Sequence, residues 1–273
     1  MKLTFGIRAH DVKKDTDIDT LLDEVNALGI ENIQLVIPKA LKICNYSTGN
    51  IKVIKESISV HNVNVSMLGA YFNPVHSNID VVNAGISNFL SNINIASELG
   101  CKYVGSETGS YNDHPWTFVP KNHTEKAFNQ TRNVFAELVK QAELKDVCVL
   151  VEPAWAHVIY DVPTAERFVK SFNSTHIQVT IDLFNLLYAG NFEKRNEIFE
   201  EALSTFKDSV KIIHLKDGKI ENGKKVQLPP GRGDFDYPFM LACIKKYCPN
   251  AVLTFEGVSA KDIPFSLKYL NKF

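Results

Sequence analysis

The sequence has no apolar stretch that approaches the ~20 residues needed by a membrane-spanning helix. Charged or titratable residues at Arg8, His10 and Asp11 also interrupt the apolar start of the chain, which argues against a secretory signal. We therefore expect no membrane partner and a cytoplasmic location.

Cysteine is scarce and carries no recognisable pattern. The five cysteines are an odd number, and no two of them form a C-x-x-C pair. This excludes a disulfide framework and disfavours a thiolate zinc site, so we expect a chain with reduced thiols. The five are Cys44, Cys101, Cys148, Cys243 and Cys248.

An excess of charge of one sign is also missing. Lys and Arg number 30 against 31 for Asp and Glu, which leaves a formal net charge of -1. Non-specific binding to nucleic acid needs many uncompensated phosphate contacts, so no nucleic-acid partner is expected. The composition shows no break or low-complexity tract, and we predict one domain over residues 1–273.

What the sequence does contain is a regular alternation of two kinds of segment. Short runs rich in β-branched residues alternate with longer amphipathic stretches, and several runs are apolar throughout, which is typical of parallel strands buried on both faces. The expected strands are Leu3–Arg8, Asn32–Val36, Val63–Ala70, Tyr103–Ser106, Val147–Glu152, Ile177–Asp182, Val210–Leu215 and Val252–Glu256.

Helix signals separate these runs. Asp17 and Thr124 stand where N-caps are expected, and Gly29 and Gly100 stand where helices should end. Eight units of roughly 34 residues each predict an α/β fold, a single (β/α)8 TIM barrel. A doubly wound open sheet is the alternative, but no G-x-G-x-x-G turn follows the first strand.

The last four predicted strands each end in a side chain that can titrate or bind a metal. These side chains are Glu152, Asp182, His214 and Glu256, at separations of 30, 32 and 42 residues, with an extra loop in the last interval. Since a TIM barrel carries its active site at the C-terminal ends of its strands, we expect the four to converge. One such residue alone could equally be a helix cap or an ion-pair partner.

Three carboxylates and one imidazole form a hard, oxygen-rich ligand set. Such a set favours one divalent cation, Mn²⁺, Mg²⁺ or Co²⁺, and Zn²⁺ also fits because an imidazole is present. A cation there would polarise a carbonyl and stabilise the enediolate formed when the adjacent carbon loses its proton.

These segments resemble a known family. The motifs are VEPAWAH (151–157), TIDLFNLL (180–187), IIHLKDG (212–218), PGRGDFDY (230–237) and LTFEG (253–257), and they resemble the sugar phosphate isomerase/epimerase family of xylose-isomerase-like barrels. The resemblance implies a metal held by Glu152, Asp182, His214 and Glu256. It also implies that Glu152 and Glu256 are catalytic and exchange a proton with a small sugar, sugar phosphate or keto-polyol. Family members commonly dimerise or tetramerise, so a homo-oligomer is compatible with it.

One position departs from the family pattern. Many members carry a histidine three residues after the strand-six aspartate, where this chain has Asn185. An amide can donate a hydrogen bond to substrate but cannot carry a proton, which weakens the case for a second metal.

Several residues near the quartet are candidates for substrate binding, each with a structural alternative. His157 contacts substrate or caps a loop, and Trp155 forms an apolar wall or packs its loop. Lys216 pairs with a substrate oxygen or a neighbouring carboxylate, and Asp217 is expected to orient a loop. Arg232, in a glycine-rich loop after strand seven, is either an anion contact or a solvated arginine.

The first half of the barrel offers further candidates. Arg8 and His10 stand at the end of strand one, and Gln34 lies in strand two. Tyr71 follows strand three and Glu107 follows strand four, so all are expected to face the barrel mouth. Glu107 binds substrate, caps a helix or forms an ion pair.

Two other functions are open at this stage. Abasic-site endonucleases of the same superfamily cleave phosphodiesters, but they use several metals and additional histidines, and residue 185 is not histidine. A non-catalytic sugar-binding barrel is the other alternative; the intact quartet argues against it, while Asn185 leaves it open.

Overall fold

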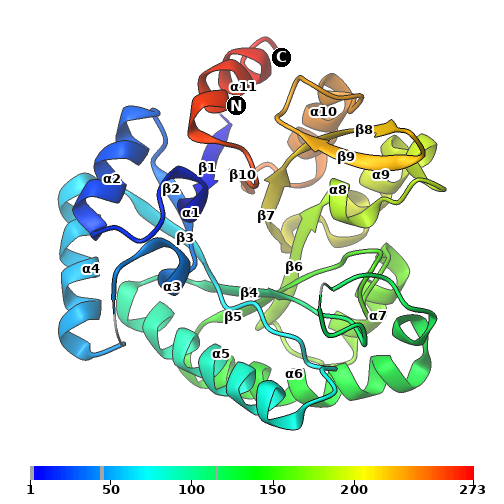
Figure 1. Cartoon of the computed structure of the whole chain (residues 1–273), viewed down its shortest axis with the longest axis horizontal. Coiled ribbons are helices and arrows are strands. Elements are labelled where there is room, and N and C mark those ends of the chain that lie inside the picture. The colour runs from blue at the N-terminus through cyan, green and yellow to red at the C-terminus, as the bar shows by residue number, and fades with distance from the viewer. Residues whose placement is uncertain (1–2, 44–45, 115) are drawn as a thin grey trace.

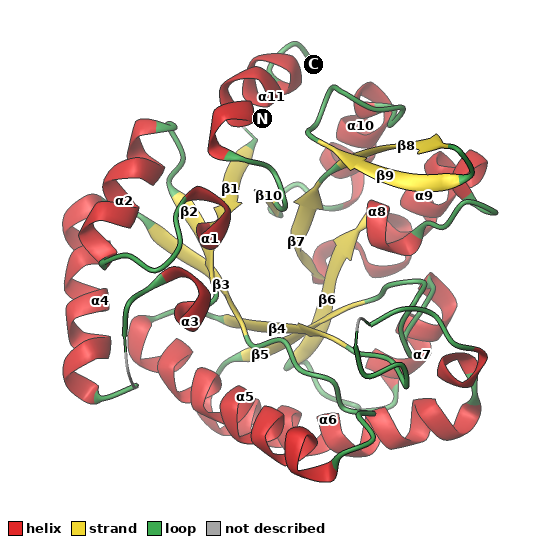
Figure 2. Cartoon of the chain, viewed as in Figure 1, coloured by secondary structure: helices red, strands yellow, loops and turns green. Residues whose placement is uncertain are grey.

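Eight parallel strands close into a barrel in the computed structural model, which describes residues 3–43, 46–114 and 116–273 (Figures 1 and 2). The strand order β1-β10-β7-β6-β5-β4-β3-β2 confirms the predicted TIM barrel. The strands are β1 (Thr4–Arg8), β2 (Asn32–Leu35), β3 (Asn64–Gly69), β4 (Tyr103–Glu107), β5 (Cys148–Glu152), β6 (Ile177–Asp182), β7 (Val210–Leu215) and β10 (Val252–Phe255).

Helices form the outer ring around the strands, as Figure 2 shows. The longer ones are α2 (Ile18–Ala27), α4 (Thr48–His61), α5 (Ile79–Leu99), α6 (Glu125–Lys145), α7 (Val162–Lys170), α9 (Arg195–Phe206), α10 (Tyr237–Tyr247) and α11 (Ile263–Leu270). Short helices α1 (Ala9–Val12), α3 (Ile37–Ala40) and α8 (Leu183–Leu186) follow strands β1, β2 and β6. Within the described ranges, no helix combines the length and apolar character needed to cross a bilayer.

The helix boundaries follow local chemistry. Asp17 accepts a hydrogen bond from the Thr20 backbone N–H at the start of α2, and Thr124 caps α6 in the same way. Gly100 ends α5 with a φ of 77°, a left-handed conformation that glycine adopts without a steric penalty. These caps and this stop were predicted.

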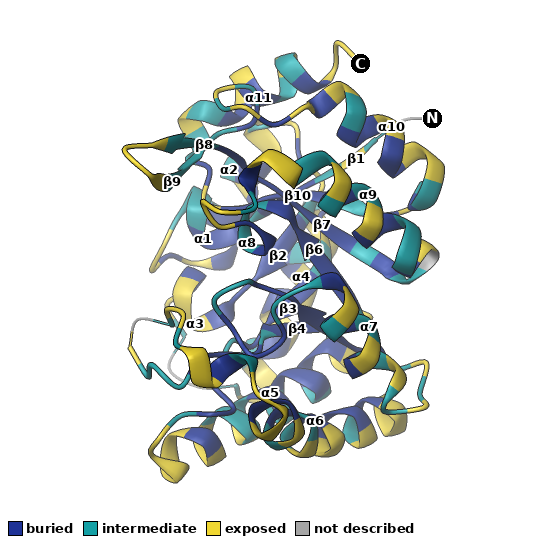
Figure 3. Cartoon of the chain, turned by 90° about the vertical axis from the view of Figure 1, so that its right-hand side faces the viewer, coloured by how far each residue is buried: buried dark blue, intermediate teal, exposed yellow. Residues whose placement is uncertain are grey.

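The strands are mostly buried, whereas the outer faces of the helices are exposed (Figure 3). Every residue of β5 is buried, as its continuous apolar run predicts for a strand covered on both sides. Met67, Cys148, Leu150 and Ile212 fill the barrel interior. Gly105 is needed in β4 because a Cβ there would lie 2.5 Å from the Met67 sulfur.

The long interval before the last barrel strand contains a hairpin that the sequence analysis treated only as an extra loop. Strands β8 (Asp217–Glu221) and β9 (Lys224–Leu228) pair antiparallel outside the barrel. Their turn is Asn222-Gly223, with φ values of 52° and 73°. An Asn-Gly pair between two short strands is a strong local signal for such a hairpin, and it was overlooked.

The thiols of the described cysteines should be unreactive in the folded chain. Cys101, Cys148, Cys243 and Cys248 are buried thiols outside any disulfide, while Cys44 lies outside the described residues. Burial raises the pKa of Cys101 to about 11 and that of Cys148 to about 12. Raised values keep both thiols protonated at pH 9, above the ordinary pKa of about 8.5, so we expect no labelling by a disulfide reagent in a native Cys44→Ser variant.

Four thiols should react once the same variant is unfolded in denaturant. Rapid labelling of the native protein at pH 9 would contradict the buried placement of these side chains.

Candidate metal centre and active site

Four side chains converge at the C-terminal mouth of the barrel. Glu152 ends β5, Asp182 ends β6, His214 lies in β7, and Glu256 directly follows β10. One ligand atom from each lies within 4.8 Å of the others, and all four residues are buried. The register of the parallel strands places these residues at the same height along the barrel axis. Asp182 of β6 is the register partner of His214 of β7, and His214 is the partner of Thr254 of β10, two residues before Glu256. The structure therefore brings the predicted quartet together.

The imidazole of His214 points one nitrogen into this cluster. Its Nδ1 lies 2.6 Å from Glu256 Oε2, 3.4 Å from Glu152 Oε1 and 3.6 Å from Asp182 Oδ2. Its Nε2 lies 2.8 Å from the Gln34 amide oxygen. A proton on Nε2 would be donated to Gln34. Burial would lower the pKa of His214, but the charges of Glu256 and Glu152 outweigh it and raise that pKa well above its usual range. Nδ1 therefore keeps a proton among the carboxylates, and a bound cation would displace it.

Three of the converging atoms are buried without a well-oriented hydrogen bond. They are Nδ1 of His214, Oδ2 of Asp182 and Oε2 of Glu256. Buried polar atoms normally make well-oriented hydrogen bonds, and carboxylate oxygens that lack them around an imidazole nitrogen fit the ligand shell of a divalent cation. The residues present therefore pass the chemical test for a metal site.

A second layer holds the quartet in position. The Asn185 amide donates to Glu152 Oε1 at 2.7 Å, and its backbone N–H donates to Asp182 Oδ1 at 3.1 Å. Arg8 forms an ion pair with Glu256 and a bidentate pair with Asp11 at 2.8 and 2.9 Å. The amide of Gln34 in turn donates to the Tyr71 hydroxyl at 2.7 Å.

Positive charge balances the carboxylates. Lys216 Nζ lies 2.6 Å from Asp182 Oδ2 and 3.2 Å from Glu256 Oε2. Burial alone would raise the pKa of Asp182, but the Lys216 charge and His214 outweigh it and lower that pKa. Burial opposes ionisation of Glu256 too, yet His214 and Lys216 hold its pKa well below the ordinary value. Asp182 and Glu256 therefore stay ionised, as metal binding requires.

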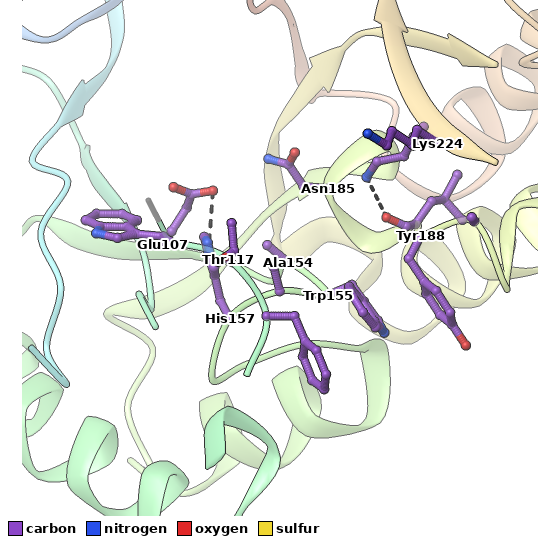
Figure 4. A pocket seen from close by; sticks show the side chains of 14 residues that line it. Glu107, Thr117, Ala154, Trp155, His157, Asn185, Tyr188 and Lys224 are labelled. Atoms are coloured by element: carbon purple, nitrogen blue, oxygen red, sulfur yellow. Dashed lines mark hydrogen bonds and ion pairs between the residues drawn. The ribbon is translucent and has the colours of Figure 1, made fainter. Parts of the chain in front are cut away.

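A cavity of about 760 Å³ opens beside the quartet (Figure 4). Asn185 borders both, and Glu107 pairs in register with Glu152. Burial and the charges of Glu152 and Glu256 raise the pKa of Glu107 well above its usual range. The lining residues are Glu107, Trp116, Thr117, Phe118, Ala154, Trp155, Ala156, His157, Asn185, Leu187, Tyr188, Ala189, Lys224 and Lys225.

Most of the predicted substrate contacts lie at this cavity or at the quartet. His157, Trp155, Asn185 and Glu107 line the cavity, and Figure 4 shows His157 and Glu107 facing one another. His157 Nδ1 is buried, lies 3.8 Å from Glu107 Oε1 and has no hydrogen-bond partner. Burial lowers the pKa of His157 to about 4, so its ring is neutral at pH 7.

Three further candidates lie outside the cavity lining. Lys216 contacts Asp182 and Glu256 of the quartet. His10 is buried in α1, and burial together with the Arg8 charge lowers its pKa to about 4. Arg232 is exposed and stacks over the Phe265 ring at 3.9 Å, away from the cavity-lining residues.

Asp217 orients its loop, as expected. Its carboxylate accepts backbone hydrogen bonds from Gly218, Gly231 and Phe235 at 2.8 to 3.0 Å. A Cβ at Gly233 would lie 2.4 Å from Asp217 Oδ1, so the close approach requires glycine.

Sequence reasoning missed several residues around the cavity. Trp116, Phe118 and Tyr188 lie in loops where no periodic pattern marks them, and Lys225 belongs to the overlooked hairpin. Lys225 donates to the Phe184 and Leu187 carbonyls at the end of α8, and burial lowers its pKa to about 8. The aromatic residues after strands β4 and β6 were the available signal.

Solved structures with the same fold are similar over nearly the whole chain. A 3-keto-D-glucoside 4-epimerase, YcjR, from E. coli has a TM-score of 0.75 and 15% identity, with 100% of both chains covered. A xylose isomerase domain protein from Planctomyces limnophilus has a TM-score of 0.78 and 16% identity, covering 99% of this chain and 96% of that one. A xylose isomerase-like TIM barrel protein from Mycobacterium smegmatis in complex with magnesium has a TM-score of 0.74 and 14% identity, covering 99% and 95%. No curated protein sequence matches.

The closed parallel barrel, with a buried carboxylate and imidazole cluster at its C-terminal mouth, defines a TIM barrel with a candidate active site in the usual place. The family model described as xylose isomerase-like TIM barrel matches residues 22–272. The chain belongs to this family, which confirms the resemblance inferred from the motifs.

Proposed function

We propose that this protein is a divalent-metal-dependent isomerase or epimerase of a small sugar, sugar phosphate or related keto-polyol. The observation that carries the proposal is the convergence of Glu152, Asp182, His214 and Glu256. Three of these residues point buried polar atoms without a well-oriented hydrogen bond toward one another. Support also comes from similar structures named as sugar epimerases, including an L-ribulose 3-epimerase and a D-psicose 3-epimerase. Because one fold can support many functions, the proposal rests on the residues of the site and not on the fold.

The quartet would hold one cation. Its oxygen-rich ligands favour Mn²⁺, Mg²⁺ or Co²⁺, and the imidazole also suits Zn²⁺. When bound, a cation of this kind polarises a substrate carbonyl and stabilises negative charge on its oxygen. Gln34 fixes the orientation of His214, and Lys216 offsets the remaining charge of Asp182 and Glu256.

Glu152 and Glu256 are the proposed acid and base. They enter from β5 and from the end of β10, with β6 and β7 between them, so they approach the site from separate sides. A base on one side can remove a proton beside the carbonyl while an acid on the other returns it, which inverts or moves the stereocentre. Asn185 positions Glu152, and Arg8 positions Glu256.

The cavity would hold the rest of the substrate. His157, Glu107 and Asn185 offer hydrogen-bonding groups to sugar hydroxyls, while Trp155, which is stacked between two other rings, offers an apolar edge to the carbons. Lys216 would contact a substrate oxygen beside the quartet. His10, in the short helix after β1, would contact the substrate from that side of the mouth. Arg232 stacks on Phe265 outside the cavity lining, and a contact between its side chain and an anionic substituent stays a prediction. The cytoplasmic location, the one-domain organisation and the homo-oligomer also stay predictions.

The test is proton exchange. The protein is stripped of metal, reloaded with Mn²⁺, and incubated in D₂O with a panel of ketoses and ketose phosphates. Deuterium at the carbon beside the carbonyl of at least one substrate supports the proposal. Absence of exchange across the panel, together with cleavage of an abasic-site DNA duplex, would replace it by phosphodiester hydrolysis.

Removing the partner of His214 should weaken metal binding without touching a ligand. We expect Gln34→Leu to reduce Mn²⁺ affinity by about 10- to 100-fold, because the imidazole loses the acceptor that orients it. Tyr71→Phe is the matched control, since it removes only the hydroxyl that Gln34 contacts and should have a smaller effect. Equal affinities in Gln34→Leu and the unaltered chain, measured by Mn²⁺ titration, would contradict this arrangement.

A further inference from the structure

Aromatic rings form one side of the cavity. Phe118 stacks on Trp155 with centroids 4.6 Å apart, and Trp155 stacks on Tyr188 at 4.2 Å. The three rings come from the loops after β4, β5 and β6. We call Phe118, Trp155 and Tyr188 the aromatic wall. Trp116 lines the same cavity but contacts His157 instead, with centroids 5.8 Å apart. The aromatic wall joins loops that share no strand pairing of their own.

The aromatic wall keeps apolar surface in contact with solvent. Phe118 and Tyr188 each retain 37% exposure although both line a cavity. A purely structural stack would gain more by burying these faces, and contiguous exposed apolar surface commonly marks a binding site. Figure 4 shows Trp155 and Tyr188 on the side of the pocket away from Glu107.

The other side of the cavity is polar. Glu107, His157 and Asn185 lie there, and Asn185 contacts the quartet through Glu152. His157 is 5% exposed, and its Nδ1 atom is buried without a hydrogen-bond partner. This nitrogen lies 3.8 Å from Glu107 Oε1, so both groups belong to the polar side. The cavity thus passes from hydrogen-bonding groups beside the quartet to flat apolar surface farther out.

The size of the cavity exceeds what one sugar ring would fill. Pockets of roughly 300–1,000 Å³ accommodate drug-sized ligands, and this one has about 760 Å³ in addition to the space among the four quartet residues. A single sugar ring bound beside the quartet would fill the polar side of the cavity and leave the outer rings of the aromatic wall uncovered. A ligand with a sugar at one end and a second flat ring at the other matches both ends.

We propose that the aromatic wall is a subsite for a second ring, joined to the sugar that is bound beside the quartet. The second ring presents a flat face of C–H groups, as in another sugar, or of aromatic carbon, as in an aryl group. The proposal rests on the proposed function for the identity of the reacting sugar, and it narrows the substrate class to sugars that carry such a ring.

The test measures binding of ligands that differ only in the second ring. Methyl β-glucoside, phenyl β-glucoside and methyl β-cellobioside are titrated by calorimetry into Mn²⁺-loaded protein. Fluorescence then locates the ligand, because the chain has two tryptophans and both, Trp116 and Trp155, line this cavity. We expect at least one two-ring ligand to bind roughly three- to tenfold more tightly than the methyl glucoside, the gain typical of one ring stacking on another.

Variants of the aromatic wall should remove this preference. Tyr188→Leu keeps apolar bulk but loses the flat face, and Phe118→Leu makes the same change on the other outer ring. Phe273→Leu is the matched control, because this exposed ring lies outside the cavity lining and contacts Tyr269 instead. We expect the ratio of dissociation constants to fall toward one in the first two variants and to persist in the third.

The outcomes separate the two proposals. Tighter binding of the phenyl compound alone identifies an aryl ring, and tighter binding of the cellobioside alone identifies a second sugar. Equal binding of all three ligands, or a preference that survives in both wall variants, overturns the subsite even if ketoses exchange protons. A wall-dependent preference without proton exchange on any ketose would leave the subsite standing and overturn the proposed reaction.

Discussion

Replacing Glu152 or Glu256 by glutamine is expected to slow proton exchange by about two to four orders of magnitude, the usual contribution of a positioned acid or base. Glutamine keeps the size of the side chain and one ligand oxygen, but it cannot accept the proton. Both carboxylates are buried, and each is held by one positioning partner, Asn185 or Arg8. The measurement is deuterium incorporation at saturating Mn²⁺, so that weaker metal binding does not produce the loss.

The matched control is Glu197→Gln, the same chemical change at an exposed position in the first turn of α9. It should exchange at the rate of the unaltered chain. Circular dichroism and melting temperature establish that each site variant is folded. Exchange within threefold of the unaltered rate in Glu152→Gln or Glu256→Gln would remove that residue from the proton-transfer step.

Metal loading should stabilise the fold by a large margin. A ligand at one hundred times its dissociation constant adds about 2.7 kcal/mol, and for a chain of this size that raises the melting temperature by roughly 5–10 °C. The physical reason is local: a cation would give the buried atoms of Asp182, His214 and Glu256 one shared partner, and it would add positive charge among three close carboxylates that Lys216 balances only in part. Calorimetry of chelator-treated and Mn²⁺-loaded protein measures the difference.

His214→Asn should lose this shift, because asparagine places no imidazole nitrogen among the carboxylates. His176→Asn is the matched control, since this imidazole lies partly exposed beside Asp146 and outside the quartet. A full thermal shift in His214→Asn would place the cation elsewhere. Absence of a shift with Mg²⁺, Mn²⁺, Co²⁺ and Zn²⁺ in the unaltered chain would argue against a metal centre.

The barrel and its quartet were accessible from the sequence for a simple reason. Parallel strands buried on both faces appear as continuous apolar runs, and β5 and β6 begin and end where those runs predict, within one residue. The C-terminal ends of such strands meet at one mouth. A titratable residue at the end of four successive runs therefore marks Glu152, Asp182, His214 and Glu256 without any knowledge of side-chain positions.

The second layer could not be predicted because it spans the barrel. Arg8 and Glu256 are 248 residues apart, and Gln34 and His214 are 180 apart. Closure of β1 against β10 brings the first pair together, and the second pair reaches across the mouth. The sequence analysis placed Arg8 and Gln34 at the mouth, but their partners depend on side-chain directions in the closed barrel.

The cavity was less predictable still, because loops build it. Trp155 was considered from its place after β5, whereas Phe118 and Tyr188 stand in loops without a periodic pattern. The stack of these three rings exists only when the loops after β4, β5 and β6 fold over the same side. Arg232 shows the converse: its loop was a reasonable anion site, yet its guanidinium stacks on Phe265.

The central claim is that the four side chains at the barrel mouth bind one divalent cation. Crystals grown or soaked with Mn²⁺ and measured at a wavelength where manganese scatters anomalously test it most directly. We predict one strong anomalous peak per chain, within bonding distance of Glu152, Asp182, His214 and Glu256. A map without a peak between these residues, or with the only peak at another position, would contradict the account.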